Sequence, residues 1–260
     1  FSTEVASQVF DLIAPFAGYA FNKAHSVSYA VIACWTAYLK AHYPGEYMTS
    51  LLSLYAEREE KVASAVAECH RLKIAVLPPD INHSQAAFSL EGGGIRFGLA
   101  NVKNVGEQAV APIIQAQKKG GPFRSLEDLC RRADLRGLNS RAWESLIKAG
   151  ALDCLGPRGG LLASLSRILA LAQNEQRRRE TGQTTMFDLF GDTVPVPLPA
   201  LDILGQELPP AEARQWEREL LGVPLSHSPL EALARQGGQE VTLIWEDLTE
   251  DMLGQPVVLA

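Results

Sequence analysis

The 260-residue sequence contains no apolar run long enough to cross a membrane, because charged residues or prolines interrupt every candidate stretch. Its first residues carry no basic region of the kind that opens a secretory signal peptide. Cysteine is scarce, and the four cysteines (Cys34, Cys69, Cys130 and Cys154) form no C-x-x-C pair. Four cysteines are too few for disulfide bonds to be the main stabilisation of a chain of this length. We therefore expect reduced core thiols in a cytoplasmic protein, without a zinc site.

The sequence also lacks the short motifs that mark a self-contained active site. It contains no G-x-S-x-G turn, no H-E-x-x-H motif, no Walker loop and no Asp-x-Asp pair. Hydrolases and transferases need a positioned nucleophile or a metal held by neighbouring carboxylates. We therefore expect no catalytic residues in this chain, and a small-molecule enzyme that depends on nucleotides is disfavoured.

Charge is distributed unevenly along the chain, whose formal net charge is −6. Residues 95–150 carry a net charge of +5, whereas residues 181–260 carry −10. A basic centre beside an acidic tail is typical of a surface that meets a polyanion next to a segment that avoids it. A solvated helical face would give the same pattern, so charge alone leaves both interpretations open.

Apolar periodicity predicts a mainly helical chain. Helices are expected over residues 1–60, and the stretch 25–42 is apolar on nearly all sides, which predicts a helix buried in a core. Residues 57–72 show a clean amphipathic pattern, and the apolar runs beside the triple glycine 92–94 predict a β-hairpin. Short helices, separated by glycines, are expected between residues 107 and 179.

The C-terminal part of the chain has a different pattern. Residues 181–210 are rich in proline and have no helical period, which predicts a linker. A short helix with Pro210 in its first turn is expected next. Residues 241–245 and 256–260 are typical of strands that open an all-β module, so we expect the chain to be a piece of a longer protein.

One segment fits a helix-hairpin-helix turn, in which a short helix, a tight turn and a second helix direct backbone N–H groups at a phosphate oxygen. It begins at Val102, and Asn104 stands where such turns usually have their first glycine, since asparagine tolerates the left-handed backbone. Glycine suits such a turn because it takes positive φ and approaches the phosphate closely, and Gly106 is the glycine present. A second hairpin is possible at Gly150. A plain connection between helices is the alternative.

Basic residues surround the first hairpin, which favours contacts with a duplex backbone that do not read the base sequence. These basic residues are Arg96, Lys103, Lys118, Lys119, Arg124, Arg131 and Arg132. The residues that we expect to touch DNA are Lys103, Asn104, Val105, Gly106, Lys118, Lys119 and Gly150.

A loop near the N-terminus combines a ring, a cation and an imidazole in Tyr19, Lys23 and His25. The lysine suits a phosphate, and either ring suits a base or sugar, so the loop is a candidate site for a nucleoside triphosphate. The alternative is an ordinary loop between helices with a satisfied histidine.

The linker contains large apolar residues that fit no periodic face. Gln183, Met186 and Phe187 belong to this group. An exposed Met-Phe pair is either an anchor for a partner's pocket or a clip that binds back onto the same chain. The residues alone favour neither interpretation.

Six segments carry a resemblance to a known family. They are Phe16-Ala-Gly-Tyr-Ala-Phe-Asn-Lys-Ala-His-Ser26, Tyr38-Leu-Lys-Ala-His-Tyr-Pro44, Leu77-Pro-Pro-Asp-Ile-Asn82, Arg96-Phe-Gly-Leu99, Leu146-Ile-Lys-Ala-Gly-Ala-Leu-Asp153 and Glu219-Leu-Leu-Gly-Val-Pro-Leu225. In content and order they resemble α subunits of bacterial DNA polymerase III, over almost the whole chain. The departures are Asn104, where a glycine is usual, and residues 223–229, which differ from the family's common form.

The resemblance implies a mainly α, multi-domain fragment. Residues 1–84 would be the C-terminal part of the polymerase fingers, and residues 85–180 a tandem helix-hairpin-helix domain that binds duplex DNA. Residues 181–210 would be a linker with a sliding-clamp motif. Residues 211–260 would be a connector helix and the first strands of an OB-fold β-barrel.

The resemblance also implies residue roles and partners. The residues that would bind the nucleotide are Tyr19, Lys23 and His25. The residues that would bind the clamp are Gln183, Met186 and Phe187. The full-length enzyme would be a replicative DNA-directed DNA polymerase that uses Mg²⁺ held outside this chain, so the fragment alone would bind no metal and be inactive. Its partners would be primer–template duplex DNA, deoxynucleoside triphosphates, the β sliding clamp and other holoenzyme subunits, away from any membrane.

Two alternatives stay open at this point. One is an error-prone paralogue within the same polymerase family. The other is a non-catalytic adaptor that binds DNA with the same hairpins.

Overall fold

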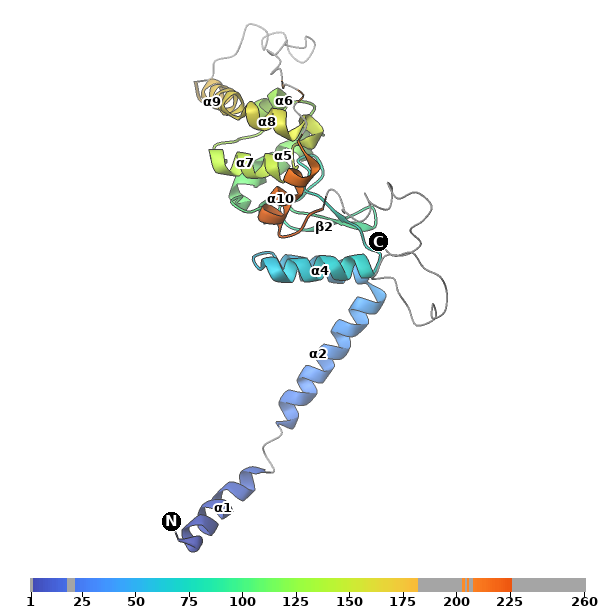
Figure 1. Cartoon of the computed structure of the whole chain (residues 1–260), viewed down its shortest axis with the longest axis vertical. Coiled ribbons are helices and arrows are strands. Elements are labelled where there is room, and N and C mark those ends of the chain that lie inside the picture. Colours follow the sequence, from blue (N-terminus) through green and yellow to red (C-terminus); the bar gives the residue numbers. More distant parts are fainter. Residues whose placement is uncertain (1, 18–21, 182–202, 204, 206–207, 226–260) are drawn as a thin grey trace, which may run out of the picture. The chain divides into compact units, whose positions relative to one another are not determined.

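The computed structural model describes residues 2–17, 22–181, 203, 205 and 208–225. Helices dominate the described chain, and a small three-stranded sheet accompanies them (Figure 1). The chain divides into two compact units, residues 1–47 and residues 48–260. The mainly helical fold predicted from the sequence is confirmed.

The first unit contains two predicted helices, α1 (Thr3–Ala17) and α2 (Lys23–His42). The side chain of Asn22 caps α2, because its Oδ1 accepts a hydrogen bond from the His25 N–H at 3.0 Å. An asparagine at this position satisfies one of the N–H groups that the first turn of a helix leaves unpaired.

The prediction that this second helix is buried in a core is wrong for this structure. No residue of α2 is buried, and Trp35 is 65% exposed. The same holds for Val27, Tyr29, Ile32 and Tyr38, which are all exposed. An apolar pattern indicates which side chains favour burial, but it does not identify the element that would cover them.

The second unit begins with two helices that pack apolar faces inward. Helix α3 (Pro44–Tyr55) crosses the boundary between the units and buries Met48 and Leu52 completely. Helix α4 (Glu59–Arg71) buries the face that its amphipathic pattern predicted. The buried residues of α4 are Val62, Ala65, Val66 and Cys69.

The sheet has the strand order β1-β3-β2. Its antiparallel hairpin of β2 (Ser89–Glu91) and β3 (Gly94–Arg96) confirms the prediction around the triple glycine. Gly92 and Gly93 both have positive φ, 58° and 86°, as a two-residue hairpin turn with matching twist requires. The parallel pairing of β3 with β1 (Val76–Leu77) was not predicted, because two residues are too short a run to show a period.

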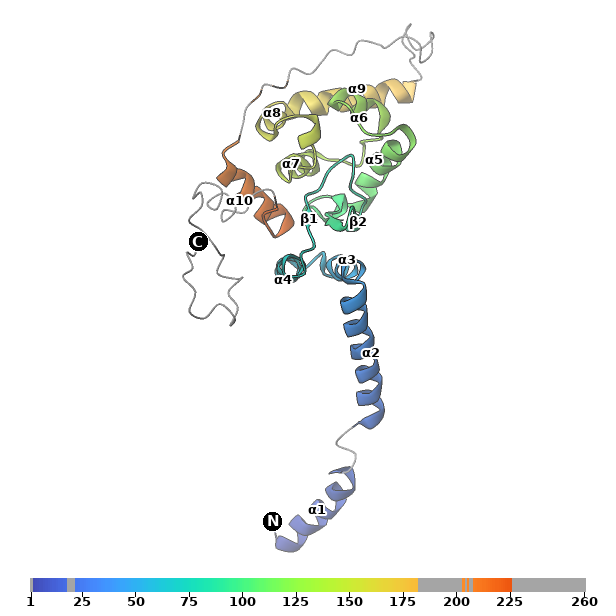
Figure 2. The same ribbon diagram turned by 90° about the vertical axis from the view of Figure 1, so that its right-hand side faces the viewer.

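The remaining helices pack around a common apolar core. They are α5 (Glu107–Gly120), α6 (Leu126–Arg132), α7 (Ser140–Lys148), α8 (Arg158–Ala163), α9 (Leu165–Thr181) and α10 (Pro210–Leu221). Helix α9 lies along α6 (Figure 2), and α7 contacts α8, α9 and α10. Trp143, Leu146 and Ile168 are at most 1% exposed and mark the centre of this core.

Helix α10 is firmly attached to the rest of the second unit. It begins at Pro210, as predicted, and its Leu220 carbonyl oxygen accepts a hydrogen bond from the Lys103 N–H at 3.0 Å. Its Glu217 is fully buried and pairs with Arg158 at 2.8 Å. A buried carboxylate needs such a partner, because an unpaired charge in the interior is costly.

Several predictions lie outside the described residues. They concern most of the linker, the strands at 241–245 and 256–260, and the site residues Tyr19, Gln183, Met186 and Phe187. They stay predictions.

The four cysteines are free thiols. Cys69 and Cys130 are buried, whereas Cys34 and Cys154 are exposed, so the expectation of core thiols is wrong for the latter two. Burial raises the pKa of Cys69 to about 11 and that of Cys130 to about 12, because the thiolate form loses its hydration.

Candidate nucleic-acid interface

The turn before α5 has the arrangement of a short helix, a tight turn and a second helix. The 3-10 helix η1 (Leu99–Asn101) leads into it. Val102 and Val105 are buried and hold the turn on the core. Between them, Asn104 is exposed with φ 68°, and its Nδ2 donates to Ser145 Oγ at 3.1 Å. Asparagine therefore takes the left-handed position, as predicted.

Gly106 contributes in a different way from the one expected. Its φ is −87°, so it supplies no positive φ. No atom lies within 4 Å of the place where a Cβ would stand, so the backbone is open to a ligand. Helix α5 has no side-chain N-cap, and the first N–H groups of a helix lack acceptors within it. Together with the helix dipole, these N–H groups suit a phosphate oxygen.

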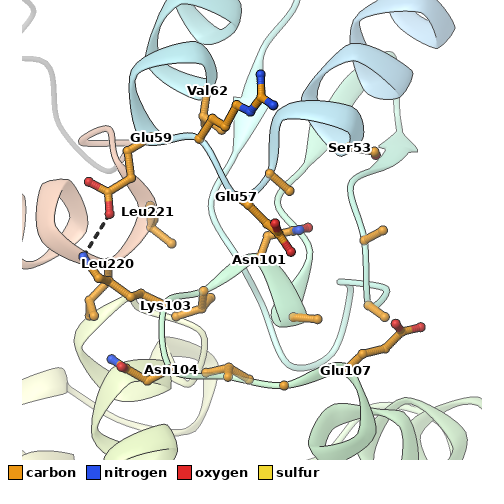
Figure 3. A pocket seen from close by; sticks show the side chains of 18 of the residues that line it. Ser53, Glu57, Glu59, Val62, Asn101, Lys103, Asn104, Glu107, Leu220 and Leu221 are labelled. Atoms are coloured by element: carbon orange, nitrogen blue, oxygen red, sulfur yellow. Dashed lines mark hydrogen bonds and ion pairs between the residues drawn. The ribbon is translucent and has the colours of Figure 1, made fainter.

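A groove of about 870 Å³ opens beside this turn (Figure 3). Ser53, Leu54 and residues 56–59 form one wall, and the turn and the end of α10 form others. Three carboxylates, those of Glu57, Glu59 and Glu107, belong to its lining. The Lys103 Nζ lies 2.9 Å from Glu59 Oε1. A phosphate that approaches Lys103 therefore competes with Glu59.

The structure does not bring Lys118 and Lys119 to this turn. Both are exposed in the last turn of α5, whereas Lys103 and Gly106 precede its first turn. At 1.5 Å per residue, the two ends of the helix are separated by about 20 Å. Lys118 and Lys119 have no ion pair within the described part of the chain. Their contact with DNA stays a prediction.

Two arginines of the basic cluster are engaged inside the fold. Arg132 Nη2 donates to the carbonyl oxygens of Ala116, at 2.9 Å, and Gly121, at 2.6 Å, which closes the C-terminal end of α5. Arg96 forms two hydrogen bonds with the Glu91 carboxylate, at 2.7 and 2.8 Å. These bonds lower the pKa of Glu91. Both arginines therefore use much of their hydrogen-bonding capacity to stabilise the fold.

The second predicted hairpin places its glycine in the interior. Gly150 is buried, has φ 85°, and its N–H donates to the Ile147 carbonyl oxygen at 3.0 Å. A Cβ at this position would clash with the guanidinium of Arg158, which pairs with Asp153 at 2.9 Å and with Glu217 at 2.8 Å. Burial raises the pKa of Asp153 more than the bond to Arg158 lowers it. The contact of Gly150 with DNA stays a prediction, and this placement disfavours it.

A loop after β1 connects the segment before α6 with the second hairpin, and the sequence did not single it out as functional. Asn82 Nδ2 donates to the Phe123 carbonyl oxygen at 3.0 Å, and its Oδ1 accepts from the Phe123 N–H at 2.7 Å. The neighbouring Ile81 N–H donates to the Ala151 carbonyl oxygen of the second hairpin at 2.8 Å. The available signal was the Pro-Pro-Asp-Ile-Asn run, because such residues form tight side-chain-bonded turns.

In the first unit, two of the three predicted nucleotide residues lie at the start of α2. Lys23 is its first residue, and His25 follows two positions later with its ring centroid 4.3 Å from that of Tyr29. Both Lys23 and His25 are exposed. Lys23 has no ion pair within the described residues, so its ammonium group is available to an anion.

The described residues hold no group of three His, Cys, Asp or Glu side chains that fits a metal ion. No helix within the described ranges is both long and apolar enough to span a membrane.

Comparison with known proteins first identifies the class of motif. Residues 73–160 match the family described as "Helix-hairpin-helix motif". This range includes all three strands of the sheet, both turns and the helices α5 to α7. The prediction of helix-hairpin-helix elements is confirmed.

The particular relatives are DNA polymerase III α subunits. The chain is 40% identical over 260 residues to the subunit of Thermus aquaticus, a match that covers 98% of this chain and 21% of the relative. It is 40% identical over 231 residues to that of Escherichia coli (strain K12), covering 88% of this chain and 20% of the relative. For Haemophilus influenzae the identity is 35% over 257 residues, or 97% and 22% of the two chains.

The chain thus spans about a fifth of the length of these relatives. The resemblance to DNA polymerase III α subunits that the sequence indicated is confirmed.

Proposed function

We propose that this chain is the part of a bacterial replicative DNA polymerase that holds duplex DNA behind the active site, carries part of the fingers and attaches to a sliding clamp. The observation that carries the proposal is the open turn at residues 102–106. It presents uncapped N–H groups at the start of α5 beside Lys103, in a chain related to DNA polymerase III α subunits.

The duplex contact follows from the chemistry of this turn. A phosphate oxygen accepts hydrogen bonds from the backbone N–H groups around Gly106, while Lys103 leaves Glu59 to neutralise the charge. Lys118 and Lys119 add a second contact at the other end of α5. Contacts of this kind hold the backbone and do not read sequence, so binding is weak and independent of sequence.

A duplex titration tests this proposal. The affinity of the chain for a labelled primer–template duplex is measured at two ionic strengths. We expect the logarithm of the association constant to fall with the logarithm of salt concentration by about 0.9 per phosphate neutralised. Two duplexes of different sequence serve as the control and bind equally. Affinity that is indifferent to salt overturns the proposal.

The proposed nucleotide contact involves Tyr19, Lys23 and His25. An exposed ammonium group and an exposed imidazole at the start of α2 support it, because both suit a triphosphate. Substituting each residue by alanine in the full-length polymerase raises the KM for nucleotide far more than it weakens duplex binding. Unchanged nucleotide kinetics assign these residues to an ordinary loop.

The proposed clamp contact involves Gln183, Met186 and Phe187, whose apolar side chains fit no helical period. Burial of Met186 and Phe187 in a partner's pocket contributes roughly 1.5–3 kcal/mol per side chain, and ordering the linker consumes part of this. A peptide therefore binds in the micromolar range or more weakly, and tethering beside bound DNA raises its effective concentration. The Met186→Ala/Phe187→Ala variant loses clamp binding in a pull-down but keeps primer extension without the clamp.

The polymerase reaction itself belongs to the full-length protein in this proposal. Mg²⁺ held outside this chain supplies charge neutralisation for nucleotidyl transfer. The described residues position duplex and nucleotide and carry out no bond-making step. A primer-extension assay with the chain alone is expected to show no product, and any template-directed extension contradicts this assignment.

A further inference from the structure

A smaller groove, of about 300 Å³, lies between α9 and the loop that joins α6 to α7. Its floor is apolar and is formed by Leu135, Leu138 and the buried Trp143. Helix α9 supplies the facing wall with Leu169 and Ala172, which are half-buried. This volume lies at the lower limit of pockets that bind ligands, enough for one or two side chains.

The rim of this groove is basic and polar. Arg136 and Arg177 are exposed on it, accompanied by Gln173 and Gln176 of α9. Arg136 pairs with Asp134 at 2.5 Å and with Glu180 at 3.9 Å, whereas Arg177 has no ion pair within the described residues and supplies the free positive charge of the rim. An apolar floor with a basic rim complements a segment that combines apolar side chains with acidic ones.

The residues that follow α9 in the sequence have this chemistry. Apolar residues dominate the stretch 186–190, whose one charged residue is Asp188, and Asp192 follows two positions after the stretch. No lysine or arginine occurs between Arg179 and Arg214. The charge of this stretch is therefore opposite in sign to that of Arg136 and Arg177.

The stretch is also close enough to reach the groove. Gln173 precedes the end of α9 at Thr181 by eight residues, or about 12 Å along the helix. The five residues from Thr181 to Met186 span up to about 17 Å when extended. Met186 can therefore return to the groove without any change in the described part of the fold.

We propose that residues 183–192 bind in cis to the groove between α9 and the α6–α7 loop, with Met186 and Phe187 on its apolar floor. Asp188 then lies within range of Arg177 at the rim. Because a short tether raises the effective concentration into the millimolar range, a contact that is weak for a free peptide suffices. The cis contact stands whether or not a clamp binds the same residues, and its test below contains no clamp.

Limited proteolysis of the full chain tests the proposal. Chymotrypsin cleavage after Phe187 and Phe190 is followed by mass spectrometry in the parent chain and in the Ala172→Glu variant, which places a carboxylate in the groove. Ala170→Glu is the matched control, because Ala170 is exposed on α9 and does not line the groove. We expect cleavage to accelerate at least about fivefold in Ala172→Glu and to be unchanged in Ala170→Glu.

Two further measurements keep the proposal falsifiable if Ala172→Glu fails to fold. Arg177→Glu, a change at an exposed residue, also accelerates cleavage. Met186→Ala/Phe187→Ala removes the side chains proposed for the floor and accelerates cleavage after Phe190. Equal cleavage rates in all variants overturn the proposal. Protection that increases with protein concentration also overturns it, because the occupant is then a second copy of the chain.

Discussion

The clearest structural perturbation is Asn82→Ala. The Asn82 side chain makes both hydrogen bonds that a neighbouring strand would make with Phe123, accepting from its N–H and donating to its carbonyl oxygen. Phe123 is 3% exposed, so little water reaches these backbone groups after the change. The variant therefore leaves a donor and an acceptor without partners inside the fold.

The expected magnitude follows from these two bonds. A hydrogen bond contributes about 0.5–1.5 kcal/mol net, and a buried group left unpaired adds its desolvation penalty. We expect Asn82→Ala to lower the free energy of unfolding by about 1–3 kcal/mol. In a domain of 150–250 residues each kcal/mol lowers Tm by about 2–4 °C.

Thermal and denaturant unfolding, followed by circular dichroism, measure this effect. The matched control is Asn174→Ala on the exposed side of α9, which should change the free energy by less than about 0.5 kcal/mol. Asn82→Asp keeps the acceptor but sets a second oxygen against the Phe123 carbonyl, so it should not restore stability. An Asn82→Ala variant as stable as the control refutes the view that this side chain fixes the loop before α6.

Three further predictions concern charge and thiols. Glu59→Gln removes the ion pair with Lys103 and is expected to raise duplex affinity by about 1.4- to 5-fold, the worth of an exposed ion pair. The control Glu60→Gln on the same helix should leave the affinity unchanged. Thiol labelling at pH 8 should modify the exposed Cys34 before the buried Cys69 and Cys130. Burial limits access of the reagent to the latter two, and their raised pKa values lower the fraction of reactive thiolate. Equal labelling rates refute this order. Because the pKa of Glu91 is lowered, its ion pair stabilises the fold fully above the ordinary glutamate pKa of 4.5. This contribution disappears as pH falls through the lowered value. Arg96→Gln should therefore destabilise the chain at pH 7, and the loss should shrink as the pH is lowered below 4.5.

Periodic and local features were predictable from the sequence. The amphipathic face of α4, the two-glycine hairpin and the left-handed Asn104 each depend on neighbours in the chain. Their physical causes are side-chain spacing and backbone sterics, which a sequence displays directly.

Features that depend on distant partners were not predictable. Arg132 and Arg96 carry the charge of a DNA-binding cluster, but their guanidinium groups bond to carbonyl and carboxylate oxygens of the fold. Gly150 resembles an open hairpin glycine until Arg158 is seen against it. The role of Asn82 rests on a contact with Phe123, 41 positions along the chain.

The central claim is that the turn at residues 102–106 binds phosphate through backbone N–H groups, and one pair of variants at Gly106 tests it most directly. Gly106→Pro removes the N–H, and Gly106→Ala keeps it and places its methyl group in open space. With both variants folded to the same Tm, duplex affinity is measured by fluorescence anisotropy at low salt. We expect Gly106→Pro to lose at least about tenfold in affinity, the worth of a hydrogen bond to a charged group, and Gly106→Ala, which keeps the N–H, to lose much less. Equal binding by the two variants contradicts the account.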